Sequence, residues 1–146
     1  MPTPVSWDDA AKMAADVSRK AFPSVPDTAW EKVARAWFND QDGRPAAGYD
    51  PALGKSFSPT DGAPPSLWPQ FEALKNAAVL VIRGETSDLL SSATVAEMQA
   101  RHPNCARLEV KGEGHAPLLM DAASIGAIKA FYAAADAGMS VSGRTY

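Results

Sequence analysis

The first segment of the chain repeats apolar residues with a helical period. A capping box at Ser6 predicts a helix over 7–20, with one apolar face formed by Ala10, Met13, Ala14 and Val17. Asp27 is predicted to cap a second helix, whose apolar residues follow at i, i+3, i+4, i+7 and i+8: Trp30, Val33, Ala34, Trp37 and Phe38. This aromatic stripe is interpreted as helix core or as a surface packed on another domain, in preference to the lining of an acyl pocket. From Asp40 to Pro65 the chain is rich in Gly and Pro and is predicted to be irregular, with a turn at Asp42-Gly43.

The second segment alternates helix and strand signals. Ser66 is expected to cap a short helix, and the β-branched run from Ala78 to Arg83 predicts a parallel strand covered on both faces. Ser91 or Ser92 opens a helix that ends near Arg101, a second strand runs over 107–110, and Asp121 caps a last helix. The fold class is therefore α/β, a small parallel β-α-β unit with flanking helices. We expect three parts: a helical segment over 1–65, the α/β segment over 66–137, and a frayed polar tail over 138–146.

Composition narrows the class of protein. A chain of 146 residues, 46% hydrophobic and 21% charged, is that of a water-soluble globular domain. A net charge of -3 without a basic run argues against nucleic acid, and no apolar stretch approaches the roughly 20 residues of a membrane span. No signal peptide is evident, and the lone Cys105 favours the cytoplasm. With two histidines and one cysteine, neither a metal site nor a cofactor is expected.

Two residues stand out as candidates for catalysis. His115 lies in the loop Gly112-Glu113-Gly114-His115-Ala116-Pro117, where small neighbours leave its imidazole free to act as a general base, although a turn histidine without a function fits equally well. Asp88 follows the first predicted strand, where ligand sites of α/β sheets form, and could fix the tautomer of a histidine. Taken alone, Asp88 is better explained as a residue at the start of the next helix, and Glu85 competes for the acid role. His102 is expected to face solvent at a helix end, and Asp121 is expected to be only an N-cap.

In combination these motifs are more specific. The segment from Leu67 to Leu74, the strand and loop Val79 to Leu90, the Gly112–Pro117 loop and the closing helix resemble the C-terminal third of α/β-hydrolases. In that family a strand ending in Arg-Gly-Glu-x-Ser-Asp carries the acid and a Gly-x-Gly-His loop carries the histidine. The resemblance implies that Asp88 is the acid and His115 the base, and that the N-terminal helices are a remnant of the family's helical cap.

The nucleophile of that family has no counterpart in the sequence. Its elbow, Gly-x-Ser-x-Gly, occurs nowhere, and only two strands are predicted of a sheet that should have about eight. Three interpretations stay open: an ester hydrolase that recruits another serine, a non-catalytic remnant or interaction module, and a truncated form of an ordinary hydrolase. A small-molecule ester is the expected substrate if the chain is active. Because the strand Val79 to Ile82 would have a bare edge, we expect the chain to form a homo-oligomer, most simply a dimer.

Overall fold

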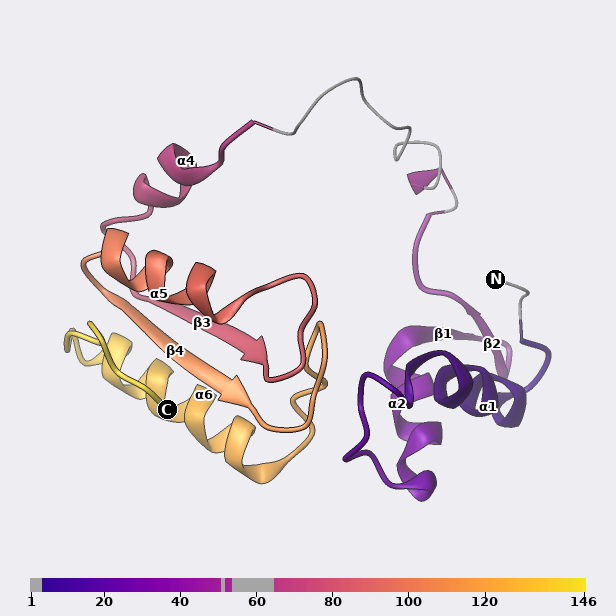
Figure 1. The fold of residues 1–146 in the computed structure, drawn as a ribbon. Helices are drawn as coiled ribbons and strands as arrows, with labels where there is room; N and C mark the ends of the chain where they lie inside the picture. The colour runs from indigo at the N-terminus through magenta and orange to yellow at the C-terminus, as the bar shows by residue number, and fades with distance from the viewer. Residues whose placement is uncertain (1–3, 51, 54–64) are drawn as a thin grey trace. The chain divides into compact units, whose positions relative to one another are not determined.

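The computed structural model describes residues 4–50, 52–53 and 65–146 (Figure 1). The chain divides into two compact units, Met1–Pro64 and Pro65–Tyr146. No helix within the described ranges is long and apolar enough to cross a membrane.

The first unit is built on two helices. Helix α1, Trp7–Ser18, begins at the predicted cap, where the Asp9 N–H donates to Ser6 Oγ at 3.1 Å. Helix α2, Trp30–Trp37, follows the short 3-10 helix η1, Asp27–Ala29. Its prediction was wrong in one respect, because Asp27 does not cap α2 but pairs with Arg19. The core between the two helices consists of residues at most 3% exposed: Ala10, Ala14, Trp30, Val33 and Ala34.

A β-hairpin follows α2 where the sequence predicted irregular chain. Strands β1, Phe38–Gln41, and β2, Arg44–Ala47, pair antiparallel around the predicted turn, with φ of 53° at Asp42 and 79° at Gly43. Positive φ at both central positions is the type I′ geometry that matches strand twist. The strands escaped prediction because they are short and mostly exposed, and because Phe38 continues the helical spacing although it already belongs to β1.

The second unit has the predicted α/β order. The short helix α4, Trp68–Glu72, precedes strand β3, Val79–Gly84, helix α5, Ser92–Arg101, strand β4, Cys105–Val110, and helix α6, Ala122–Asp136. Strands β3 and β4 are parallel, with Val79 opposite Cys105 and Gly84 opposite Val110. Two predicted N-caps are confirmed: Ser91 Oγ accepts from the Thr94 N–H at 3.0 Å, and Asp121 Oδ1 accepts from the Ser124 N–H at 2.8 Å.

Apolar residues cover the β3–β4 pair on both faces, as the unbroken apolar run of β3 predicted. One face packs on α6, through a cluster of Ala106, Phe131, Ala134 and Val141 with Leu80 at its border. The other packs on α5, through a cluster of Val81, Val95 and Cys105 with Val79 and Met98 at its border. Figure 1 shows the two helices on either side of the pair. This two-sided burial is what holds a sheet of only two strands in one register.

The last residues differ from the frayed tail that their polarity suggested. Val141 is fully buried in the cluster against α6, and its N–H donates to Asn104 Oδ1 at 2.7 Å. Tyr146 packs edge-on against Phe131, with ring centroids 6.4 Å apart. These two side chains, together with the backbone hydrogen bonds between the segment and β4, dock residues that on average are polar.

Candidate active site

The two candidate catalytic residues lie in loops at one edge of the β3–β4 pair. Asp88 follows the end of β3 at Gly84, and His115 follows the end of β4 at Val110. Because the strands are parallel and Gly84 is opposite Val110, both loops leave the sheet at the same end. This is the edge at which ligand sites of α/β proteins form.

Hydrogen bonds of backbone and side-chain groups join the two loops to one another. The N–H and the hydroxyl of Thr86 both donate to the Glu113 carbonyl, each at 3.0 Å. In return Glu85 Oε2 accepts from the Gly112 N–H at 2.9 Å, and the Glu85 N–H donates to the Val110 carbonyl at 2.9 Å. The loop after β3, which carries Asp88, and the loop after β4, which carries His115 (the histidine loop), are therefore fixed relative to each other. This holds independently of any contact between Asp88 and His115.

Gly84 allows this close approach. A Cβ atom at Gly84 would lie 2.1 Å from the Gly114 carbonyl oxygen and 2.4 Å from that of Glu113. Both contacts are to backbone, so a side chain here would have to push the histidine loop away from β3.

Glu85, the competitor for the acid role, is occupied in holding the loops together. The Gly112 N–H, and after it the Lys111 ammonium at 3.0 Å, hold the pKa of the Glu85 carboxyl below its usual range. A second carboxylate, Glu113, is buried and accepts from the Leu118 N–H at 2.6 Å. Glu113 escaped the sequence analysis because a glutamate between two glycines in a loop is ordinarily solvated.

Asp88 and His115 are both exposed, and within the described residues no hydrogen bond or ion pair connects their side chains. The resemblance predicts that the Asp88 carboxylate meets the His115 imidazole within about 3.2 Å or through one bridging water, and of these two arrangements the direct contact is not formed. With neither side chain buried, water solvates both, and nothing in the sheet forces their rotamers to converge. The two loops are therefore joined to each other without a direct bond between the Asp88 and His115 side chains.

His102 was wrongly predicted to face solvent. Only 2% of it is exposed, and its Nδ1 accepts from the Asn104 N–H at 3.1 Å. The imidazole packs against Phe71, with ring centroids 5.4 Å apart, and within the described residues its Nε2 has no hydrogen-bond partner. His102 is thus a core residue that follows the end of α5, and its contacts are structural.

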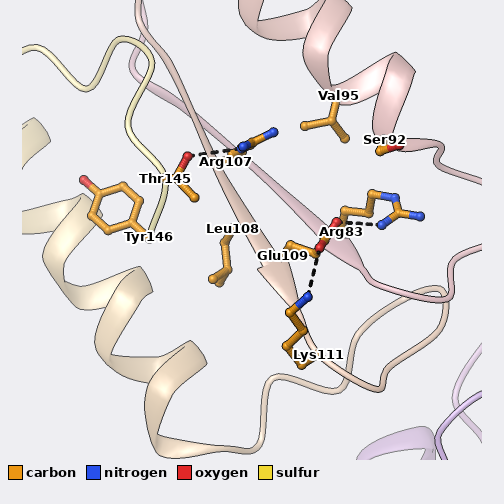
Figure 2. Close-up of a pocket in the computed structure, with 9 residues that line it drawn as sticks. All are labelled: Arg83, Ser92, Val95, Arg107, Leu108, Glu109, Lys111, Thr145 and Tyr146. Carbon is orange, nitrogen blue, oxygen red and sulfur yellow. Dashed lines mark hydrogen bonds and ion pairs between the residues drawn. The ribbon is translucent and has the colours of Figure 1, made fainter.

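A pocket of about 280 Å³ opens elsewhere on the second unit, and neither Asp88 nor His115 lines it (Figure 2). Its charged lining is largely paired internally: Arg83 contacts Glu109 at 2.8 Å, and Lys111 contacts Glu109 at 3.6 Å. Figure 2 also shows the hydrogen bond from Arg107 to Thr145. The pocket therefore does not serve the proposed acid–base pair.

Comparison with known proteins identifies the fold. No family model matches the chain. The sequence is 40% identical over 92 residues to a 3-hydroxybutyrate-oligomer hydrolase of Cupriavidus necator, a match that spans 60% of this chain and 31% of the relative. The structure is similar to an α/β hydrolase from Novosphingobium aromaticivorans, with a TM-score of 0.74, 33% identity, and coverage of 89% of this chain and 46% of that one.

Two further structures show the same fold at lower identity. An E-2-(acetamidomethylene)succinate hydrolase matches with a TM-score of 0.59 at 22% identity, covering 90% of this chain and 47% of that one. A Rickettsia typhi protein assigned as a hydrolase matches with a TM-score of 0.68 at 22% identity, covering 90% of this chain and 44% of that one. The chain thus spans about half the length of the solved structures that it matches. These findings confirm the resemblance to part of an α/β-hydrolase, and the share covered is consistent with its C-terminal half.

Proposed function

We propose that this chain carries the acid–base part of a serine-type ester hydrolase, with His115 as general base and Asp88 as the carboxylate that orients it. The observation that supports this most directly is that the loops after β3 and β4 are hydrogen-bonded to each other at the shared end of the two parallel strands. Thr86 bonds to Glu113 and Glu85 bonds to Gly112. They hold the two candidate residues on neighbouring, fixed supports, and their exposed side chains are accessible to a substrate.

In this mechanism His115 accepts the proton of a serine hydroxyl as the oxygen attacks the ester carbonyl, and returns it to the leaving alkoxide. Asp88 stabilises the imidazolium that forms between these steps. The sequence contains no Gly-x-Ser-x-Gly elbow, so the proposal places the serine at an unorthodox position of this chain, on another chain, or in a longer form of the protein. Since nucleophile, base and acid act as a unit, we expect the chain alone to be a slow catalyst or none.

The substrate class follows from the curated relative. Its name describes a hydrolase of 3-hydroxybutyrate oligomers, which are linked by ester bonds. We therefore propose short oligoesters of hydroxy acids as the natural class, and a p-nitrophenyl ester of a short acid as the simplest probe.

The first test compares wild type with His115→Ala and Asp88→Asn on the p-nitrophenyl ester. His115→Ala should abolish hydrolysis above the buffer rate, and Asp88→Asn should reduce it, because the imidazole loses its orienting carboxylate. Asp136→Asn, an exposed aspartate at the end of α6, is the matched control and should leave the rate unchanged. If wild type and His115→Ala hydrolysed the ester at the same rate and faster than buffer, the proposed role of the histidine would be contradicted.

A second test supplies the missing nucleophile. The portion of the Novosphingobium hydrolase that matches this chain is replaced by this chain, and the chimaera is assayed on the same ester and on a 3-hydroxybutyrate oligomer. We expect hydrolysis that falls by about 10²-fold or more in His115→Ala. A folded chimaera whose rate does not depend on His115 would refute the acid–base assignment.

The second candidate function is a non-catalytic interaction module. It is favoured by the separation of the Asp88 and His115 side chains, which make no direct bond within the described residues. On this hypothesis the variants of both tests behave like wild type.

A further inference from the structure

The histidine loop ends in a backbone conformation that its sequence does not favour. Leu119, just beyond the loop, has a φ of 54°. A leucine adopts such a left-handed conformation only where the surrounding structure imposes it, because its Cβ then crowds the backbone. The backbone at this end of the loop is therefore held by contacts that outweigh its own preference.

The side chain of Glu113 makes such a contact. Its Oε2 accepts from the N–H of Leu118, the residue that precedes Leu119, at 2.6 Å. A hydrogen bond from a backbone N–H to a carboxylate is shorter and stronger than one between neutral groups. The bond joins residues five positions apart, so it closes a ring over the segment 114–117, which contains His115.

The burial of Glu113 shows that its side chain is committed to this contact. The residue is 7% exposed. Removing a carboxylate from water is unfavourable unless its oxygens accept hydrogen bonds, and a glutamate in a loop can ordinarily turn into solvent. Glu113 instead directs its carboxylate to the backbone of its own loop. The position therefore calls for an acceptor, which the Glu113 carboxylate supplies to the Leu118 N–H.

The backbone of Glu113 anchors the start of the same segment. Its carbonyl accepts from the N–H and from the hydroxyl of Thr86, each at 3.0 Å. Between the two anchors, His115 and Ala116 are exposed, and within the described part of the chain neither forms a hydrogen bond through its backbone. The position of His115 accordingly depends on the two contacts that Glu113 makes.

We propose that Glu113 is the positioning residue of His115: its carboxylate fixes the course of the segment 114–117 and with it the place of the imidazole. The inference rests on the proposed function for the role of His115, whereas the ordering of the loop does not depend on that role. Glu113 acts through His115, by limiting the positions that the imidazole samples, as supporting residues do around a preorganised catalytic group.

The test changes the side chain of Glu113 and leaves its backbone bonds to Thr86 in place. Glu113→Ala removes the acceptor, whereas Glu113→Gln keeps an uncharged one at the same reach. By NMR relaxation of the full chain, the order parameter of the His115 amide should fall from about 0.85 in wild type to below about 0.6 in Glu113→Ala, and Glu113→Gln should restore it. Glu97→Ala, an exposed glutamate on α5 that pairs with Arg101, is the matched control and should leave it unchanged.

Kinetics in the chimaera described above give a second readout. There Glu113→Ala should lower kcat by about 10²-fold at an unchanged KM, with Glu113→Gln close to wild type, because a misplaced base affects the chemical step and not binding. The two proposals can fail separately. If Glu113→Ala loosens the His115 amide but hydrolysis does not depend on His115, the positioning by Glu113 is supported and the proposed function is refuted.

Two results would overturn the positioning role. One is an order parameter at His115 that is equal in wild type and Glu113→Ala. The other is a loss of amide-exchange protection throughout β3 and β4 that Glu113→Gln shares, because the carboxylate would then support the whole unit and not the histidine loop. If Glu113→Ala does not fold, Glu113→Asp decides: it keeps the charge but shortens the side chain by one methylene, and it should loosen the His115 amide in a folded protein.

Discussion

Replacing Gly84 by alanine tests whether close packing of the two loops holds the candidate site together. The added Cβ would overlap the carbonyl oxygens of Gly114 and Glu113, at 2.1 and 2.4 Å. Overpacking of this kind costs about 1–3 kcal/mol, and displacing the loop would also weaken the two hydrogen bonds from Thr86 to Glu113, at about 1 kcal/mol each. We therefore expect Gly84→Ala to destabilise the second unit by about 2–4 kcal/mol.

The assay is amide hydrogen exchange of β3 and β4, which reports the second unit without contributions from the first. The matched control is Gly126→Ala within α6, where an added Cβ would meet nothing within 4 Å. Because alanine is the better helix former, this control should be stabilised by about 0.5–1 kcal/mol. If the opening free energy measured for Gly84→Ala lay within about 0.5 kcal/mol of that of wild type, the loops would be loosely packed and would not fix the site.

Three further predictions concern stability and can be read by urea unfolding. His102→Ala should cost about 2–4 kcal/mol, since it empties a buried site, whereas His115→Ala should stay within about 0.5 kcal/mol because its side chain is exposed; equal effects would contradict the assignment of one histidine to the core and the other to the surface. Asp121→Ala should cost about 1 kcal/mol at pH 7 and Asp121→Asn almost nothing. Hydrogen bonds from the Ser124 side chain and N–H lower the pKa of the Asp121 carboxyl in the folded state. The carboxyl therefore stabilises the fold fully above its unfolded pKa of about 3.9, and this stabilisation disappears as the pH falls through the lower folded pKa. Asp121→Asn should lack this pH dependence. Val141→Ala should cost about 2 kcal/mol, because the tail is docked through a fully buried side chain, and a frayed tail would instead show no effect.

Hydrophobic periodicity predicted the elements whose patterns have a single interpretation. The short β-branched run of β3 favoured a strand buried on both faces, and the serine and aspartate caps marked where α5 and α6 begin. The strands of the hairpin were missed because they are short and mostly exposed, although the Asp42-Gly43 turn between them was predicted. His102 was misplaced because a histidine before a proline gives no sign that Phe71 covers it. That contact joins segments distant in sequence, which periodicity does not report.

The strands and loops that carry the two candidate residues could be predicted from the sequence, whereas the hydrogen bonds of the site could not. Parallel strand order alone brings Asp88 and His115 to one edge, and this could be inferred from the sequence. The hydrogen bonds from the Thr86 N–H and hydroxyl to the Glu113 carbonyl could not, because a carbonyl acceptor leaves no trace in the residue types. These bonds also explain why the loops stay together although the side chains do not meet. Their order is independent of the acid–base contact, so His115→Ala can remove the imidazole while the loop that presents it keeps its position, and a loss of activity in that variant can be assigned to chemistry.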